Sequence, residues 1–568
     1  MRAMMRFFVA FTALACVSPA LAKGPILAQH EMVSAASPLA AQAGFDVLKA
    51  GGSAVDAAVA VQSVLTLVEP ESSGIGGGAF MLVWDPKTKT LTTFNGRETA
   101  PASATPAMFL NGDGTPMSYL QALPGGRSVG VPGDVAMLAL AQKKFGKLAW
   151  SKLFDAVVRN ANAGIPISPK LAEELHAFPM MGKMPAVHAL FYKADGTPLA
   201  QGDILKNPAL AKTMQQIAQG GPDVFYHGPI AQEIADAVTH APVNAVTMTL
   251  GDIAAYKAEE KPALCGTYRG FRVCAPPPPS SGGVTLLQML SILEHYQSAQ
   301  LKPQTVLGIH LISQASRLAY ADRDEYLGDP DFVRMPLDGL LNATYLTSRA
   351  KLISLDRDMG TASFGTPPTK RADLIRYVPN RFPGLHGTSH FTIVDKNGEV
   401  VSMTTSIEFI LGSELSAGGF MLNNELTDFS FEPERDGKPV ANAVASGKRP
   451  LSSMTPVIVF DRSGAFAFAL GSPGGKKIIP YVAEAVSAMI DGRLNIQQAA
   501  ELPHHVNTNG PLELERDTPL IALTPQFQAM GYTVNASSET SGTYGIAHSA
   551  HGYEGGADPR RDGVAIGD

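Results

Sequence analysis

The chain has 568 residues, of which 45% are hydrophobic and only 17% are charged, a composition typical of a globular protein that excludes charge-driven disorder. Its 45 Lys and Arg against 51 Asp and Glu give a formal net charge of −6. This argues against a protein that binds nucleic acid, because such proteins carry a basic surplus. After the N-terminus, no apolar run reaches the ~18 residues of a membrane-spanning helix.

The N-terminus has the pattern of a secretory signal. Two arginines precede an apolar stretch at 7–17 that is too short to span a bilayer, and Ala-Leu-Ala at 20–22 forms an A-x-A cleavage site. We therefore predict a signal peptide at residues 1–22 and a mature chain that begins near Lys23, in a periplasm or outside the cell. The alternative is a buried N-terminal helix. A lipoprotein signal at Cys16 is disfavoured, because Ala13 stands three residues before it in place of Leu.

The first half of the chain is predicted to be mostly helical. Residues 36–69 carry Ala-rich helical periodicity, and residues 130–260 are also mainly helical in pattern. Between them, Gly-Ile-Gly-Gly-Gly at 74–78 is followed by two alternating stretches that predict paired strands. The glycine run lacks the G-x-G-x-x-G spacing and acidic partner of a dinucleotide site, so we interpret it as a tight turn.

Once the signal is removed, two cysteines remain, Cys265 and Cys274. The residues between them predict two short strands that turn at Arg269-Gly270. In an oxidising compartment the pair could form a cross-strand disulfide, or it could remain as two half-buried thiols. Two cysteines at this spacing do not make a zinc site.

Amphipathic helices are predicted at 285–296 and 306–330. The second contains three acidic residues, Asp322, Asp324 and Glu325. A metal site is one interpretation of this cluster, but we favour a solvated helix face.

The C-terminal third has a different pattern. Residues 353–387 are Pro-rich and aperiodic, which predicts an exposed loop or linker. Residues 387–408 then predict a strand, a turn at Lys396-Asn397-Gly398 and a second strand. Another strand pair is expected at 455–472, followed by a helix at 481–492.

A threonine lies where the predicted loop enters the strand, in Gly387-Thr388. A threonine hydroxyl is a poor nucleophile without a base beside it, and a free α-amine on the same residue, with a pKa near ~8, can serve as that base. Freeing this amine requires cleavage of the Gly387–Thr388 bond. Glycine before the bond offers little steric hindrance to an N-to-O acyl shift by the Thr388 hydroxyl.

Motifs along almost the whole mature chain resemble, in order, those of the γ-glutamyltransferase (γ-glutamyl transpeptidase) family of N-terminal-nucleophile hydrolases. The matching stretches are AGGSAVDAAVA (50–60), EPESSGIGGGAF (69–80), NGRETAP (95–101), PPPPSSGG (276–283), LAYADRDEYLGDP (318–330), GTSHFTIVDKNGE (387–399), GGFMLNNELTDFS (418–430), KRPLSSMTP (448–456), GSPGG (471–475) and ADPRRDG (557–563).

The resemblance implies an α/β (α+β) fold, the four-layer αββα sandwich of N-terminal-nucleophile hydrolases. It also implies self-cleavage between Gly387 and Thr388. One precursor would give a large subunit, 23–387, and a small catalytic subunit, 388–568, which pair as a heterodimer. No metal or organic cofactor, no nucleic acid and no membrane span after signal removal are expected.

The resemblance also assigns roles to individual residues. Thr388 corresponds to the nucleophile and Ser406 to a hydroxyl that hydrogen-bonds it, where Thr is the usual residue. Gly474 and Gly475 correspond to the pair whose N–H groups form the oxyanion hole, and glycine suits that role because it lets the backbone approach the intermediate closely.

The other matches concern the amino-acid end of the substrate. Arg97 corresponds to the arginine that binds the α-carboxylate, assisted by Ser452 and Ser453, since a planar guanidinium suits a bidentate carboxylate contact. Glu425 and Asp428 correspond to the groups that hold the α-ammonium. Glu408 stands where much of the family has Asn, so it would either help to hold the ammonium or signal a different acyl group.

The implied activity is cleavage of the γ-glutamyl amide of glutathione and related compounds, with transfer to water or to amino acids and peptides. One alternative is an acylase for glutaryl-cephalosporins. It is suggested by Glu408 and by residues 431–447, which lack the Tyr lid of several relatives and would leave the site more open. A second alternative is an inactive periplasmic relative that only binds amino-acid-like solutes.

Overall fold

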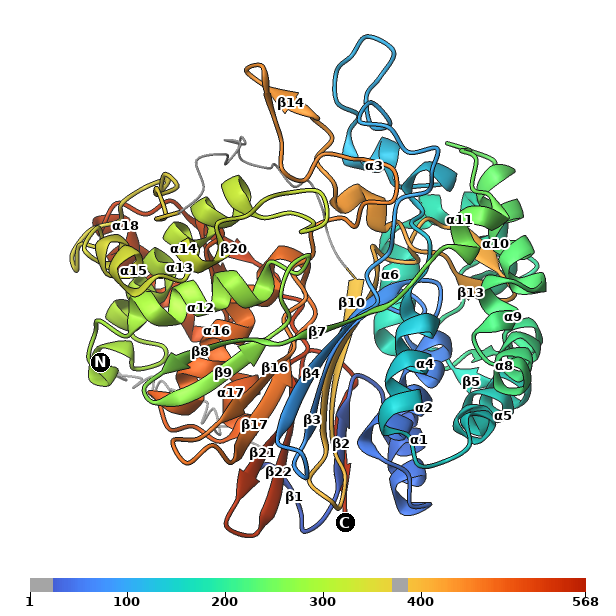
Figure 1. The fold of residues 1–568 in the computed structure, drawn as a ribbon, viewed down its shortest axis with the longest axis horizontal. Coiled ribbons are helices and arrows are strands. Elements are labelled where there is room, and N and C mark those ends of the chain that lie inside the picture. The colour runs from blue at the N-terminus through green and yellow to red at the C-terminus, as the bar shows by residue number, and fades with distance from the viewer. Residues whose placement is uncertain (1–23, 370–386) are drawn as a thin grey trace, which may run out of the picture.

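Two seven-stranded sheets, stacked face to face between layers of helices, form the centre of the molecule (Figure 1). The computed structural model describes residues 24–369 and 387–568. The predicted signal peptide, 1–22, lies outside the described residues, and so does the part of the predicted loop at 370–386.

The first sheet has the order β1-β22-β21-β17-β16-β9-β8. Its strands are β1 (Ile26–Ala28), β22 (Gly552–Ala557), β21 (Tyr544–Ser549), β17 (Phe466–Gly471), β16 (Val457–Phe460), β9 (Phe271–Ala275) and β8 (Leu264–Tyr268). The second has the order β23-β2-β10-β11-β3-β4-β7. Its strands are β23 (Val564–Gly567), β2 (Met32–Ala35), β10 (Gly387–Val394), β11 (Val400–Glu408), β3 (Gly78–Asp85), β4 (Thr90–Asn95) and β7 (Glu259–Pro262).

The facing surfaces of the two sheets form one apolar cluster. Val394 and Val400 of the second sheet pack in it with Ile458 and Ile546 of the first. Side-chain hydrogen bonds also cross the gap, such as Thr392 Oγ1 to the Tyr544 carbonyl at 3.1 Å. Every residue of β10 and β11 is buried, because helices cover the other face of their sheet.

Helices make the two outer layers. Helices α1 (Pro38–Lys49) and α2 (Ala54–Val68) cover the second sheet, and all residues of α2 are buried, which explains why this segment is rich in small and apolar residues. Helices α12 (Gly282–Leu293), α13 (Val306–Tyr326) and α16 (Ile478–Ile490) cover the first sheet. The predicted αββα sandwich is confirmed (Figure 1).

The predicted helical region 130–260 contains α4 to α11, and several helices complete the layers. They are α3 (Tyr119–Ala122), α4 (Asp134–Phe145), α5 (Asp155–Ala163), α6 (Pro169–Ala177), α7 (Pro185–Phe191), α8 (Pro208–Gly220), α9 (Asp223–Tyr226), α10 (Pro229–Thr239), α11 (Leu250–Ala254), α14 (Leu337–Leu340), α15 (Ala343–Ala350), α17 (Ile496–Glu501) and α18 (Thr524–Ala529). Minor strands are β5 (Ile165–Pro166), β6 (Ile204–Leu205), β12 (Ser416–Ala417), β13 (Phe420–Met421), β14 (Glu434–Arg435), β15 (Lys438–Pro439), β18 (His505–Val506), β19 (Leu512–Glu515) and β20 (Val534–Ser537).

Of the two alternatives for the cysteines, the structure contains the disulfide. Cys265 of β8 and Cys274 of β9 are register partners and are bonded to each other. The turn between the strands is where the sequence predicts it, at Arg269 and Gly270. Both residues have positive φ (52° and 82°), as a tight hairpin turn requires.

The prediction of a solvated acidic face on the second helix is wrong. Asp322 and Glu325 of α13 are each only 1% exposed, because α13 is enclosed by other elements. Asp322 accepts hydrogen bonds from Gln288 and Tyr345 and lies 3.2 Å from Arg349. Within residues 24–369 and 387–568, no group of three or more His, Cys, Asp or Glu is arranged to hold a metal ion.

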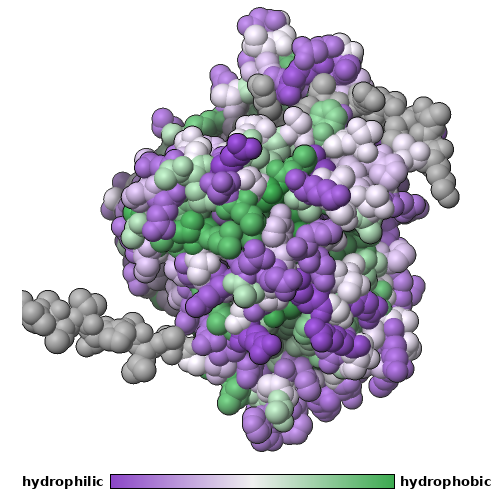
Figure 2. All heavy atoms as spheres, turned by 90° about the vertical axis from the view of Figure 1, so that its left-hand side faces the viewer, coloured by the Kyte–Doolittle hydropathy of each residue, from purple (hydrophilic) through white to green (hydrophobic). Residues whose placement is uncertain are grey.

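Figure 2 views the side of the molecule on which α15 and α18 lie in Figure 1. Hydrophilic residues cover much of this face, and hydrophobic residues gather in a patch across its upper half. None of the helices in the described part of the chain combines the length and apolarity needed to cross a membrane.

Candidate active site

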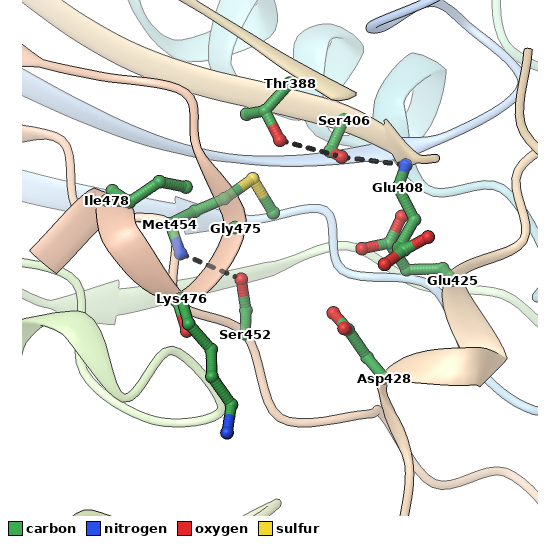
Figure 3. A pocket seen from close by; sticks show the side chains of 11 residues that line it. Thr388, Ser406, Glu408, Glu425, Asp428, Ser452, Met454, Gly475, Lys476 and Ile478 are labelled. Atoms are coloured by element: carbon green, nitrogen blue, oxygen red, sulfur yellow. Dashed lines mark hydrogen bonds between the residues drawn. The ribbon is translucent and has the colours of Figure 1, made fainter. Parts of the chain in front are cut away.

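A small pocket opens where the first residues of β10 meet the last residues of β11 (Figure 3). Its lining comes from distant parts of the chain and includes Thr388, Ser406, Glu408, Glu425, Asp428, Ser452, Ser453, Met454, Gly475, Lys476 and Ile478. Most of the predicted site residues are therefore brought together. The exceptions are Arg97, Gly387 and Gly474, which are not among the lining residues.

The Thr388 hydroxyl lies in a short chain of hydrogen bonds. Its Oγ1 is 2.6 Å from the Gly387 carbonyl oxygen and 3.2 Å from Ser406 Oγ. Ser406 Oγ also donates to the Gly387 carbonyl at 2.9 Å and accepts from the Glu408 N–H at 2.8 Å. A register shift between Gly387 and Ser389 presents Thr388 at this point, as bulges beside active sites often do.

Close packing fixes the backbone before Thr388. A Cβ on Gly387 would lie 2.5 Å from the Glu71 carbonyl oxygen, so only glycine fits. On the far side, Arg561 Nη1 donates to the Thr388 carbonyl at 3.0 Å. The next side chain, Ser389, donates to Glu69 Oε2 at 2.6 Å. These contacts hold both sides of the Gly387–Thr388 bond.

The turn after β17 brings the predicted oxyanion-hole glycines to the pocket. Gly474 and Gly475 have φ of 131° and 57°, a backbone that residues with side chains rarely adopt. A Cβ on Gly474 would also lie 2.6 Å from the Tyr481 ring. Gly475 lines the pocket and begins the short turn that leads into α16.

Arg97 lies fully buried behind the acidic side of the pocket. Its Nη1 donates to Glu425, its Nη2 donates to Asp428 and to the Leu451 carbonyl, and its Nε donates to the Pro450 carbonyl. In this state the guanidinium is held by the two residues predicted to bind the α-ammonium. Its predicted contact with a substrate carboxylate stays a prediction.

Two of the acidic residues next to Arg97, Glu98 and Glu425, have raised pKa values. Burial raises the pKa of Glu425 to about 8, with Asp428 and Glu408 adding to the effect and Arg97 opposing it. Burial also raises the pKa of Glu98, which lies 3.7 Å from Arg97.

Ser452 lies across the pocket from Glu425 and Asp428 (Figure 3). Ser452 Oγ accepts from the Met454 N–H at 3.1 Å, and the Ser452 carbonyl accepts from both the N–H and the hydroxyl of Ser281. Ser453 Oγ accepts from Arg323 Nη2 at 2.9 Å. Ser281 belongs to the 276–283 motif, so this motif holds the backbone of Ser452 in place.

Several residues at the site were not found from the sequence. Tyr119 and Asn424 each donate to Glu408 Oε2 at 2.6 Å, so they fix the carboxyl that replaces the family's usual Asn. Lys476 lines the pocket directly after the glycine pair. Its position directly after the GSPGG motif (471–475) was the available signal, whereas Tyr119 lies in a segment without any of the matching motifs.

Comparisons with known proteins agree with this geometry. A sequence model of the family described as Gamma-glutamyltranspeptidase matches residues 40–568. A "Glutathione hydrolase proenzyme" of Bacillus subtilis (strain 168) is 38% identical over 545 residues, covering 94% of this chain and 91% of the relative. One from Escherichia coli (strain K12) is 37% identical over 506 residues, covering 87% of this chain and 84% of the relative.

A solved structure with the same fold over its whole length is the cephalosporin acylase from Bacillus halodurans. It matches with a TM-score of 0.85 and 27% identity over 99% of both chains. The family match covers all strands of the two sheets except β1 and β2, and it includes every residue that lines the pocket. The two hydrolase relatives cover most of the chain at more than one-third identity. The chain therefore belongs to the gamma-glutamyltranspeptidase family of enzymes.

Proposed function

We propose that this enzyme is made as a precursor that cleaves its own Gly387–Thr388 bond. The observation that carries the proposal is the Thr388 hydroxyl, 2.6 Å from the carbonyl oxygen of the bond to be cut and within reach of a second hydroxyl, Ser406. The name "proenzyme" of the two relatives agrees with such processing. The products are a large subunit, 23–387, and a small subunit, 388–568.

The proposed cleavage is an N-to-O acyl shift followed by hydrolysis. Thr388 Oγ1 attacks the Gly387 carbonyl carbon, and Ser406 stabilises the developing oxyanion through its hydrogen bond to the carbonyl oxygen. The C–N bond breaks as the leaving nitrogen takes up the proton that Oγ1 gives up, which leaves an ester between Oγ1 and the Gly387 carbonyl carbon. Water hydrolyses that ester, giving a Gly387 carboxylate and a free amine and hydroxyl on Thr388.

The mature enzyme then uses Thr388 as an N-terminal nucleophile. Its α-amine accepts the hydroxyl proton while Oγ1 attacks the γ-glutamyl carbonyl, and the Gly474 and Gly475 N–H groups stabilise the oxyanion. The amine of the substrate leaves with a proton. Water or the amine of an acceptor amino acid or peptide then releases the glutamyl group from the acyl-enzyme.

The proposed donor is glutathione or a related γ-glutamyl compound. Charge complementarity supports this choice. Acidic side chains on one wall, Glu408, Glu425 and Asp428, suit an α-ammonium, while Arg97 with Ser452 and Ser453 suits an α-carboxylate. For Arg97 to reach the substrate, part of its present bonding to Glu425 and Asp428 has to be exchanged for the new carboxylate.

An acylase for glutaryl amides is the second candidate. The likeness to the cephalosporin acylase of Bacillus halodurans over 99% of both chains favours it. A glutaryl group has the length and terminal carboxylate of a γ-glutamyl group without the α-ammonium. Both activities would use Thr388 as the nucleophile. They differ in whether the acidic side chains Glu408, Glu425 and Asp428 have an α-ammonium to bind.

We propose that the enzyme acts in a periplasm or outside the cell. The predicted signal peptide at 1–22 supports export, and the Cys265–Cys274 disulfide is typical of an oxidising compartment.

Replacement of the nucleophile tests the proposal. Thr388→Ala should remain one chain of full length and lack all activity, whereas Thr388→Ser should cleave and turn over, more slowly than the wild type. Gel analysis and N-terminal sequencing of the fragments detect cleavage, and assays with γ-glutamyl and glutaryl p-nitroanilides side by side identify the donor. A wild-type protein that never splits yet binds γ-glutamyl compounds would instead be the inactive solute-binding relative.

A further inference from the structure

The turn that carries the predicted oxyanion-hole glycines packs against a tyrosine from the helix that follows it. Tyr481 lies on α16 and is fully buried. Its ring is so close to Gly474 that a Cβ on this glycine would lie 2.6 Å from a ring carbon. The ring therefore borders the backbone of Gly474 directly, and the next residue, Gly475, lines the pocket together with Thr388.

A buried acidic residue fixes the Tyr481 side chain. The Tyr481 hydroxyl donates to Glu539 Oε2, and the Glu539 side chain is itself fully buried. Burial and the nearby Glu539 raise the pKa of Tyr481, so its hydroxyl keeps the proton and remains a donor. Lys477 Nζ lies 3.1 Å from the same Glu539 oxygen. Because Lys477 follows Gly475 closely in the chain, Glu539 is bonded both to the end of the turn and to the tyrosine that packs on it.

The segment 539–542 touches the turn a second time. The Gly542 N–H donates to Ser472 Oγ at 3.2 Å, and a Cβ on Gly542 would lie 2.9 Å from the Pro473 ring. Ser472 and Pro473 immediately precede the two glycines. The same segment thus contacts the turn directly and also supports it through Tyr481.

We propose, on the basis of the function proposed above, that Tyr481 and Glu539 are positioning residues that fix the N–H groups of the two glycines for the oxyanion of substrate turnover. Glycine has more backbone freedom than any other residue, so a turn with two of them in succession needs contacts that hold one geometry. An oxyanion hole is effective because its donors are already in place when the charge develops. In the proposed self-cleavage, Ser406 stabilises the oxyanion instead. Loss of the Tyr481–Glu539 bond should therefore slow turnover and leave self-cleavage nearly unchanged.

The test is Tyr481→Phe, which keeps the ring and removes the hydroxyl. Tyr268→Phe is the matched control, because Tyr268 is also fully buried and its hydroxyl donates to Asp491, at the other end of the same helix α16. Cleaved enzymes are assayed with γ-glutamyl and glutaryl p-nitroanilides. Tyr481→Phe should lower kcat about tenfold, part of the cost of losing a whole oxyanion donor, and leave KM nearly unchanged, since these donors act in the transition state. Tyr268→Phe should keep the wild-type kcat.

Two further measurements separate positioning from stability. Glu539→Gln, which keeps an acceptor for the tyrosine hydroxyl, should retain more of kcat than Glu539→Ala. Self-cleavage of Tyr481→Phe, followed on gels, should proceed at nearly the wild-type rate.

A kcat of Tyr481→Phe that equals that of the wild type or of Tyr268→Phe would overturn the assignment. So would a rise in KM at constant kcat, which would indicate a role in substrate binding, or a slowing of self-cleavage as large as that of turnover, which would indicate a general loss of stability. Failure of the proposed function is distinct, because the wild type would then turn over neither donor, and the assignment would fall with it. An active wild type with an equally active Tyr481→Phe variant removes the assignment alone.

Discussion

Ser406 contacts the scissile carbonyl directly, so its hydroxyl can be tested separately from the nucleophile. In Ser406→Ala the Gly387 carbonyl loses the 2.9 Å donor that would stabilise an oxyanion. We expect self-cleavage to slow by about 10²–10³-fold, the usual cost of one such donor. The rate is measured on gels as the loss of full-length chain after purification.

Ser402→Ala is the matched control for this variant. Ser402 is buried on the same strand, but its hydroxyl bonds the Leu470 carbonyl at 3.3 Å, away from the cleavage site. It should cleave at nearly the wild-type rate, and Ser406→Thr should recover much of the lost rate. Equal slowing of the two alanine variants would mean that Ser406 acts only through stability of the strand.

The start of β10 is held from the opposite side by the segment that precedes β23. Arg561 Nη1 donates to the Thr388 carbonyl and its Nη2 donates to the Thr540 carbonyl, both at 3.0 Å. Because it fixes the residue that must attack, Arg561→Ala should slow self-cleavage by about 10–100-fold, the value of a charge-assisted hydrogen bond. Arg561 is a positioning residue here, since its contact is with the backbone.

Arg561→Lys should restore part of the cleavage rate. Arg516→Ala, which removes an exposed arginine, should leave the cleavage rate unchanged. The measurement is again the time course of cleavage, together with the melting temperature of each variant in an uncut Thr388→Ala background. A slow Arg561→Ala variant that melts as the parent does supports positioning. An Arg561→Ala variant that cleaves at the wild-type rate would show that Arg561 has no role in self-cleavage.

At the level of elements, local patterns predicted much of the structure. The strand-turn-strand at 387–408 and the hairpin at 265–274 were found because alternating apolar residues and Asn-Gly or Arg-Gly turns act over a few residues. The sequence patterns did not predict that the acidic residues of α13 would be buried. Its period is helical, but whether Asp322 faces solvent depends on α12, α14 and α15, which pack around it from other parts of the chain.

At the level of the site, motif resemblance located Thr388, Ser406 and the two glycines, and the pocket brings most of the named residues together. It did not locate Tyr119, which reaches Glu408 from 289 positions away in the sequence. It also did not indicate that Arg97 would be held by Glu425 and Asp428. Such contacts depend on the packing of distant segments, which no short stretch of sequence encodes.

The whole molecule is built from sheets that mix strands from both sides of residue 387. In the second sheet, β10 and β11 lie between β2 and β3, and in the first sheet β16 pairs with β9. If the chain is cut as proposed, the subunits stay joined by strand pairing and by the shared apolar core. We expect them to co-elute in gel filtration at the volume of uncut Thr388→Ala, and to part only in denaturant.

Salt distinguishes this arrangement from an association through surface charges. Exposed ion pairs are screened at 1 M salt, whereas strand pairing and buried apolar contacts are not. The subunits should therefore co-elute at 1 M NaCl as they do at low salt. Separation by salt alone would contradict the sheet arrangement described here.

The placement of the final strands has a consequence for the order of events in the cell. β22 pairs with β1, β23 pairs with β2, and Asp568 accepts from the N–H groups of His30 and Glu31. The first strands of the two sheets are thus completed by the last ones, and Arg561, which holds the Thr388 carbonyl, also lies late in the chain. If the chain cuts itself as proposed, cleavage has to wait until these late strands are in place, because a polypeptide without them lacks a contact that holds the Gly387–Thr388 bond.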